Sequence, residues 1–190
     1  MICRMETAAH PLHISVEDYL TFEAGGQVRH EFIGGRVHAM AGTSERHNLI
    51  AMNVGNAFFN HLRGGPCKTY MADFKVRLEV HREDILYYPD VMVACVRHGV
   101  EKYFLRYPKL IVEILSESTQ AIDRREKLLN YPTIPTLAEY VFIAQDTHEV
   151  TLHQREEQWR PVLLTRPDAP VEFRSIKLTV PLAQIYEGLL

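Results

Sequence analysis

Two short apolar runs dominate the pattern of hydrophobic and polar positions along the chain. Residues 110–115 read Leu-Ile-Val-Glu-Ile-Leu, and residues 90–96 read Asp-Val-Met-Val-Ala-Cys-Val after a proline. Runs this short and this uniformly apolar predict strands that are buried on both faces. Each run carries one acidic residue, Glu113 in the first and Asp90 at the start of the second. An ionised carboxylate in such surroundings costs several kcal/mol unless a cation or hydrogen-bond donors meet it, so both residues require an explanation.

The first third of the chain shows helix and hairpin patterns. Ser15 and Ser44 are favourable N-cap residues, and acidic residues follow Ser15 in the first turn. The pair Gly34-Gly35 separates two strand-like segments, which predicts a β-hairpin. Apolar residues at three-to-four spacing mark the segment after Ser44, and Gly64-Gly65-Pro66 ends it. We expect a helix, a hairpin and a longer helix over residues 15–23, 29–40 and 44–63.

The remaining pattern is rich in strands. A further helix of about twelve residues is expected to end at Tyr131, before Pro132. Residues 1–14 lack periodicity and are expected to form a loose lead-in. We predict one domain over residues 15–190, of the α/β (α+β) class, with a central mixed β-sheet flanked by helices. Besides the two buried runs, the expected strands span residues 67–80, 85–89, 139–145, 148–154, 159–165 and 175–180, and a short helix closes the chain.

Composition narrows the class of protein. The chain has 190 residues, 46% hydrophobic and 24% charged, with a net charge of −3, which is ordinary for a globular protein and lacks the basic excess of an avid nucleic-acid binder. Three widely spaced cysteines form no C-x-x-C pair, so we expect neither a disulfide framework nor a zinc site. No apolar run approaches the roughly 18 residues of a membrane span. We expect a cytoplasmic protein without a signal peptide.

Three stretches carry a resemblance to a known family. Pro89-Asp90, followed 23 residues later by Glu113, resembles the PD-(D/E)xK nuclease superfamily, although Leu115 stands where that motif has its lysine. The wider pattern resembles one branch of the superfamily, the Uma-two family of restriction-endonuclease-like proteins. The three stretches are residues 29–35, 88–93 and 108–127, and the likeness covers nearly the whole chain from about residue 14 to residue 154.

The resemblance implies a magnesium-dependent endonuclease with a restriction-endonuclease-like core. In this branch the missing lysine moves to the following helix, where Lys127 is the matching position, and Glu31 matches an additional acidic residue. Mg²⁺ prefers oxygen ligands, which Asp90, Glu113 and the backbone carbonyl of Ile114 would supply. Glu31 would bind the ion directly, bind it through water, or position a second ion. Lys127 would hold the attacking hydroxide or the phosphate as a point charge.

The resemblance also sets expectations for cofactor and partners. Mn²⁺ is expected to substitute for Mg²⁺, and the partner is expected to be nucleic acid, with DNA as the leading substrate. A homodimer is expected because nucleases of this superfamily that cut duplexes often bring two sites to two strands. Two alternatives stay open. One is a catalytically inactive nuclease fold that binds or scaffolds, favoured by Leu115 and the mildly acidic charge; the other is a hydrolase of RNA or of a small phosphodiester.

Each site residue also has an ordinary structural interpretation. Glu113 would be a strand-end carboxylate met by backbone donors or an arginine, and Asp90 a turn residue at a strand start. Glu31 would form a surface ion pair with Arg29 or Arg36.

For Lys127, the ordinary interpretation is a solvated pair with Asp123 on the helix surface, worth a few tenths of a kcal/mol. Tyr131 falls on the same helical face and indicates that this face is not wholly exposed.

Other motifs have structural interpretations. Asp73-Phe74-Lys75 spells D-x-K, but we expect the two charged residues to share the outward face of a strand, with a phosphate contact by Lys75 or Arg77 as the minor alternative. His47 and His61 lie on the apolar stripe of the long helix and are expected to be core histidines with backbone partners. The basic, aromatic connection 97–109 is expected to pack a helix or a dimer seam, rather than a phosphate backbone or a base.

Overall fold

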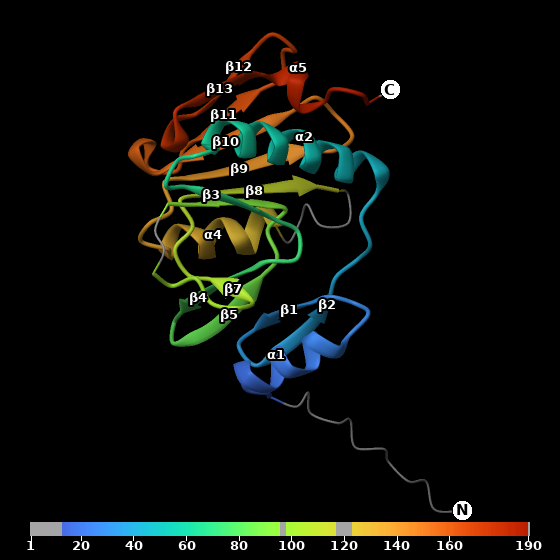
Figure 1. Cartoon of the computed structure of the whole chain (residues 1–190), viewed down its shortest axis with the longest axis vertical. Helices are drawn as coiled ribbons and strands as arrows, with labels where there is room; N and C mark the ends of the chain where they lie inside the picture. Colours follow the sequence, from blue (N-terminus) through green and yellow to red (C-terminus); the bar gives the residue numbers. More distant parts are fainter. Residues whose placement is uncertain (1–12, 96–97, 117–122, 190) are drawn as a thin grey trace, which may run out of the picture.

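A six-stranded mixed sheet runs through the middle of the molecule (Figure 1). The computed structural model describes residues 13–95, 98–116 and 123–189. The pair β8–β9 is parallel and every other pair in this sheet is antiparallel. The predicted α+β class with a central mixed sheet is therefore confirmed. In spatial order its strands are β11 (Pro161–Leu164), β10 (Val150–Gln154), β9 (Glu139–Ala144), β8 (Leu110–Leu115), β6 (Val91–Ala94) and β3 (Lys68–Met71).

One face of this sheet packs against a long helix and a C-terminal hairpin. Helix α2 (Glu45–Leu62), the hairpin β12–β13 and the short helix α5 (Leu182–Ile185) cover it. Alternate side chains of β6 and β8, such as Val91 and Val112, point into this core. Phe58 of α2 meets Phe173 of β12 edge to face, with ring centroids 4.7 Å apart. The hairpin strands are β12 (Pro170–Phe173) and β13 (Leu178–Pro181).

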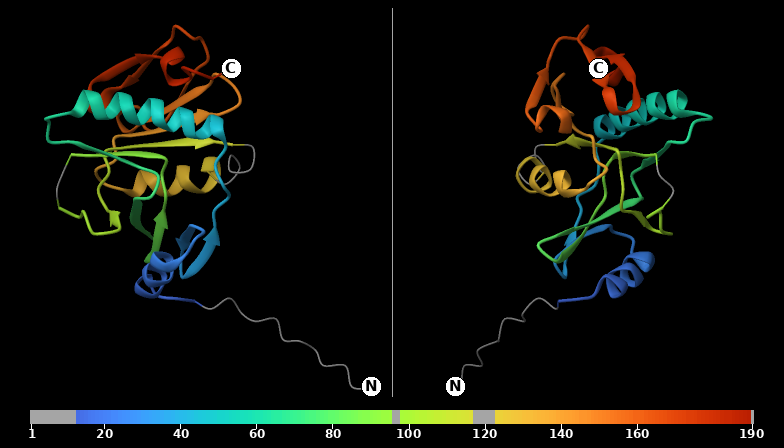
Figure 2. Two further views of the ribbon diagram at one scale, coloured as in Figure 1. Left: turned by 45° about the vertical axis from the view of Figure 1, so that its right-hand side comes forward. Right: turned by 90° about the vertical axis from the view of Figure 1, so that its left-hand side faces the viewer.

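The opposite face packs against a helical segment and a second sheet. The segment is continuous, with a π-helical part, α4 and a final 3-10 turn, and Figure 2 shows it across the sheet from α2. Met92, Ile111 and Leu115 point into this second core, where Tyr131 and Leu137 meet them. Because successive strand residues alternate faces, Glu113 lies on the same face as Ile111 and Leu115. The segment comprises η1 (Asp123–Lys127), α4 (Leu128–Asn130) and η2 (Tyr131–Thr133).

The second sheet has five strands and carries the N-terminal elements. Ser15 caps helix α1, because its side chain accepts a hydrogen bond from the backbone N–H of Asp18 at 3.1 Å. Gly34 and Gly35 both have positive φ, +52° and +83°, which suits the two-residue turn between β1 and β2. In order the strands are β2 (Arg36–Ala39), β1 (His30–Ile33), β5 (Glu83–Tyr87), β4 (Lys75–Val80) and β7 (Phe104–Leu105), with α1 (Val16–Gly25) beside β1.

Most predicted elements are present, with small shifts of their ends. The first helix, the hairpin, the long helix and both buried strands are confirmed. The helix expected to end at Tyr131 continues through Pro132 as a 3-10 turn, and its predicted start lies outside the described residues, as do residues 1–12 of the lead-in. Strands β7 and β12 were not predicted, because two to four residues beside prolines and charges give too short a pattern.

The prediction that the cysteines form no disulfide was wrong. Cys67 and Cys95 are joined by a disulfide across β3 and β6. These strands pair with Lys68 opposite Ala94, so the next pair outward is Cys67 opposite Cys95. Their separation of 28 residues hides this proximity from a search for closely spaced cysteines. In the described part of the chain, no helix is long and apolar enough to cross a membrane.

Candidate active site

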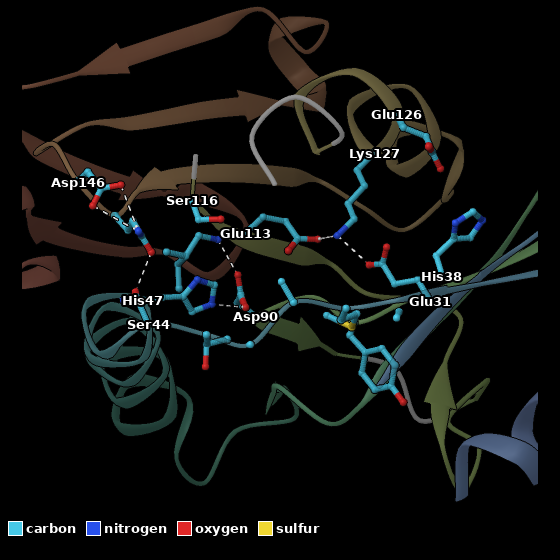
Figure 3. A pocket seen from close by; sticks show the side chains of 18 of the residues that line it. Glu31, His38, Ser44, His47, Asp90, Glu113, Ser116, Glu126, Lys127 and Asp146 are labelled. Carbon is cyan, nitrogen blue, oxygen red and sulfur yellow. Dashed lines mark hydrogen bonds and ion pairs between the residues drawn. The ribbon is translucent and has the colours of Figure 1, made fainter. Parts of the chain in front are cut away.

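A cavity of about 900 Å³ opens where β6 begins and β8 ends, beside β1 and the helical segment (Figure 3). Its walls combine carboxylates, a lysine and two histidines from separate parts of the chain. All five residues proposed from the sequence line it. These are Glu31 of β1, Asp90 before β6, Glu113 and Ile114 of β8, and Lys127 of η1.

Asp90 is held by two donors at the start of β6. Pairing between β6 and β8 ends at Val91 opposite Val112, so no strand residue meets the N–H of Ile114 on that side. Asp90 takes that place, because its Oδ2 accepts from the N–H of Ile114 at 2.6 Å. Its Oδ1 lies 2.8 Å from Nε2 of His47. The carboxylate therefore has a defined orientation at the mouth of the cavity.

Glu113 is buried in the middle of β8, with 3% of its surface exposed. Its Oε1 accepts a hydrogen bond from the hydroxyl of Tyr131 at 2.8 Å and lies 3.2 Å from Nζ of Lys127. Burial, and next the charge of Glu113, raise the pKa of Tyr131 well above its ordinary value, so the phenol remains a donor. The cost of burying this carboxylate is thus offset by a cation and a phenol.

Lys127 joins two acidic residues from different sheets. Its Nζ lies 3.0 Å from Oε1 of Glu31 and 3.2 Å from Oε1 of Glu113, and only 6% of its side chain is exposed. The ammonium also lies 5.1 Å from the centre of the Tyr87 ring. The interpretation of Lys127 as a solvated surface residue was therefore wrong, while the side chain of Asp123 lies outside the described residues.

The alternative partners proposed for Glu31 are not the ones observed. Arg29 forms its ion pair with Asp73, and Glu31 turns inward to Lys127. Glu31 is in β1, whose neighbour β5 ends close to the cavity, and this brings its carboxylate to the far side of Lys127 from Glu113.

His47 was missed by the sequence argument. Its backbone N–H is capped by Ser44, which places it in the first turn of α2, and its ring reaches Asp90 rather than the core. The expectation of a core histidine with a backbone partner was wrong for His47. His61 has the expected backbone partner, since its Nε2 lies 2.8 Å from the carbonyl of Ile176, but it is exposed and not part of the core. The position of His47 in the first turn of the helix could have indicated this, because a first-turn side chain can face the end of a sheet instead of its surface.

The D-x-K triplet does not behave as expected either. Asp73 is exposed and precedes β4, whereas Lys75 begins β4 and is buried. Ala72 has a positive φ of 49°, so a turn separates β3 from β4 and the two charged residues do not share an outward strand face. Lys75 lines a different, smaller cavity.

The donors of the site fit a hard divalent cation in kind. Asp90 and Glu113 offer carboxylate oxygens, and the backbone of Ile114 lies in the same wall. Mg²⁺ takes such oxygens and usually keeps several waters, so two carboxylates are a sufficient protein contribution. Within the described residues, no three His, Cys, Asp or Glu side chains gather as a ready-made metal cluster. An ion here would therefore depend on water and substrate oxygens for the rest of its coordination.

Comparison with known proteins gives one family. The Uma2 family, described as "Putative restriction endonuclease", matches residues 16–183. A Synechocystis protein, "Uncharacterized protein slr1290", is 33% identical over 191 residues, which cover 100% of this chain and 99% of the relative. A second from the same organism, "Uncharacterized protein sll1609", is 29% identical over 170 residues, covering 87% and 95% respectively.

One solved structure shares the fold. It is the crystal structure of "a putative nuclease belonging to DUF820" from Anabaena variabilis, and it superposes with a TM-score of 0.76 at 18% sequence identity. The match covers 93% of this chain and 99% of the other. At this identity the likeness concerns the fold.

Proposed function

The chain belongs to the Uma2 family, as its motifs predicted, and we propose that it is a magnesium-dependent endonuclease that hydrolyses phosphodiester bonds of DNA. One observation carries this proposal. Asp90, Glu113, Glu31 and Lys127 come from distant parts of the chain and line a single cavity. The ordinary structural interpretation of each residue, taken singly, does not explain why all four line the same cavity.

In this proposal Asp90, Glu113 and the carbonyl of Ile114 hold the ion. Bound Mg²⁺ would supply a water of lowered pKa and would offset the negative charge that develops on the phosphate. Neighbouring protein groups hold the two carboxylates in a fixed orientation. The Tyr131 hydroxyl orients Glu113, while His47 and the N–H of Ile114 orient Asp90.

Lys127 takes the role of the missing motif lysine. Leu115, at the usual lysine position, is buried and packs in the core between β8 and the helical segment. Lys127 reaches the same carboxylate from that segment, and its ammonium can attract a phosphate oxygen or hold a water as a point charge. Glu31 balances the lysine in the absence of substrate and keeps it inside the cavity.

One observation favours the alternative, a nuclease fold that only binds or scaffolds. Lys127 forms ion pairs with both Glu31 and Glu113 without a metal. Calorimetric titration with Mn²⁺ separates the two. An endonuclease should bind the ion, and Asp90→Asn should remove the heat; a wild-type protein that takes up no ion would favour the scaffold.

Cleavage of supercoiled plasmid tests the activity itself. With Mg²⁺ or Mn²⁺, the wild type should nick the plasmid, and Asp90→Asn or Glu113→Gln should slow nicking on the order of 100-fold or more. Asp168→Asn is the matched control, because Asp168 is an exposed carboxylate paired with Arg166. Equal cutting by all four proteins would contradict the proposal. Parallel digestion of RNA decides the substrate class.

A homodimer is also part of the proposal, since two sites would be needed to cut both strands together. Light scattering of the free protein and of its complex with a duplex measures this. A monomer in both states would restrict the activity to nicking one strand at a time.

A further inference from the structure

A second cavity, of about 280 Å³, lies between the C-terminal end of α1 and the start of β4. Tyr88 lines both this cavity and the candidate active site, so the two are neighbours. The smaller cavity is walled by the end of α1 and the segment leading to β1, together with Lys75, Tyr88 and Tyr103. None of these last three takes part in the proposed hydrolysis.

Lys75 is the unexplained group in this cavity. Only 5% of the residue's surface is exposed, yet among the described residues its ammonium has neither a hydrogen bond nor an ion pair. Its Nζ lies 4.7 Å from the ring centre of Tyr88 and 5.9 Å from that of Tyr103. Aromatic faces attract an ammonium but offer no lone pair to its three N–H donors. A ligand with an acceptor atom would give the ammonium of Lys75 a hydrogen-bond partner.

The acidic groups around Lys75 already have partners. Glu23 accepts from the Tyr88 hydroxyl at 2.8 Å and from the backbone N–H of His30 at 2.9 Å, and it also lies 3.1 Å from the ring nitrogen of His30. Asp73, at the rim, is paired with Arg29. The cavity therefore offers an unmatched donor without a large excess of positive charge.

This balance favours a neutral planar ring over a phosphate. Helix α1 ends at the cavity, and the carbonyls of a helix C-terminus carry partial negative charge, which together with Glu23 would oppose an anion. A nucleobase suits the same surroundings. Its carbonyl oxygens and ring nitrogens can accept from Lys75, its amino groups can donate to carbonyls, and its face can stack on Tyr103, which is 40% exposed.

We propose that the smaller cavity binds one unpaired base of the nucleic acid whose phosphodiester lies in the candidate active site. The proposal rests on the proposed function and deepens it, because it makes single-stranded or locally opened DNA the substrate. Tyr103 supplies the stacking surface, and Lys75 supplies the hydrogen bond to the base.

Binding without metal tests this directly, since no cleavage can then occur. Fluorescence anisotropy compares a labelled single-stranded oligonucleotide with one of the same length that carries abasic sites in place of bases. Tyr103→Ala and Lys75→Met should each weaken binding of the intact strand about tenfold or more, and should leave the abasic strand unchanged. Phe59→Ala is the matched control, because Phe59 is 55% exposed and has a cation, Arg63, over its ring, as Tyr103 has Lys102.

Three outcomes would overturn the proposal. They are equal affinity of the wild type for intact and abasic strands, binding of neither strand, and equal losses on both strands in the Tyr103→Ala variant, which would indicate a backbone contact. The plasmid assay tests the proposed hydrolase activity independently of the base pocket. Base-dependent binding without any cleavage would contradict the proposed nuclease activity and support the base pocket. Cleavage without base-dependent binding would support the nuclease activity and contradict the base pocket.

Discussion

Nζ of Lys127 lies 3.2 Å from Oε1 of Glu113, and this contact joins the helical segment to the central strand of the main sheet. Lys127 follows Glu113 by 14 residues, whereas the superfamily motif places the lysine two residues after the glutamate. The same ammonium therefore reaches the same carboxylate from a different element. Its second contact, to Glu31, adds a carboxylate from the other sheet.

Removing the lysine charge should damage both stability and activity. Lys127→Met leaves Glu113 and Glu31 without their cation in a buried place, so we expect a loss of about 3–5 kcal/mol in the free energy of unfolding. Urea titration measures it, with Lys68→Met, at an exposed strand position, as control. Adding Glu113→Gln to Lys127→Met should restore part of the lost stability and none of the nuclease activity. A fully stable single variant would show that the ion pairs are not formed.

The hydroxyl of Tyr131 should contribute measurably. Tyr131→Phe removes one donor to a buried carboxylate, which costs about 1–3 kcal/mol of unfolding free energy. The matched control is Tyr70→Phe, because Tyr70 stacks on Phe74 and does not line the cavity. Denaturant unfolding of both variants decides the question, and equal stabilities would mean that Glu113 does not use this phenol.

His47 should act by positioning Asp90. His47→Ala frees Oδ1 of Asp90, and the loss of such a support typically weakens metal affinity by about 10–100-fold. Mn²⁺ calorimetry on folded protein gives the readout. His61→Ala is the control on the same helix, because its partner is a backbone carbonyl, and it should lower stability without changing metal affinity. Unchanged affinity in the His47 variant would make that contact purely structural.

Alkaline pH should destabilise the fold through its buried tyrosines. Burial is the largest cause that raises the pKa of Tyr19, Tyr87 and Tyr131, so these phenols stay protonated in the folded protein. In the unfolded chain they ionise near pH 10. The folded state then binds more protons, so the unfolding free energy is fully retained below about pH 10 and falls as pH rises above it. Urea unfolding between pH 8 and 11 measures the slope; a flat profile would contradict it.

The disulfide should stabilise the fold without taking part in hydrolysis. Closing a segment of 28 residues by Cys67–Cys95 is worth about 3–4 kcal/mol in the chain-entropy account. Reductant should lower the urea midpoint of the wild type by the corresponding amount and should not affect Cys67→Ser, while plasmid nicking by the folded reduced protein continues. Loss of activity before unfolding would tie the disulfide to the site.

The sequence was a good guide to the strands that carry the carboxylates. A single acid in an otherwise apolar run is costly, so Glu113 had to have partners, and the helical spacing of Lys127 and Tyr131 placed both on one face. The structure confirms that placement. Family resemblance was needed to select Lys127, because local physics alone favoured a surface pair.

The errors on His47 and on the cysteines share a physical origin, since both depend on contacts between segments distant in the chain. His47 and Asp90 are 43 residues apart, and their contact follows from how α2 crosses the end of the sheet. Cys67 and Cys95 meet only because β3 and β6 pair in one register. Local periodicity describes which way a side chain faces on its own element and carries no information about which element lies opposite.

The scattered origin of the cavity has a consequence during protein synthesis. Glu31 and Asp90 leave the ribosome first, and Lys127 follows only after two thirds of the chain has been made. A fragment that ends before Lys127 therefore holds the three carboxylates without the cation that pairs with Glu31 and Glu113. We therefore expect the complete cavity, and with it the proposed nuclease activity, only after synthesis has passed residue 127.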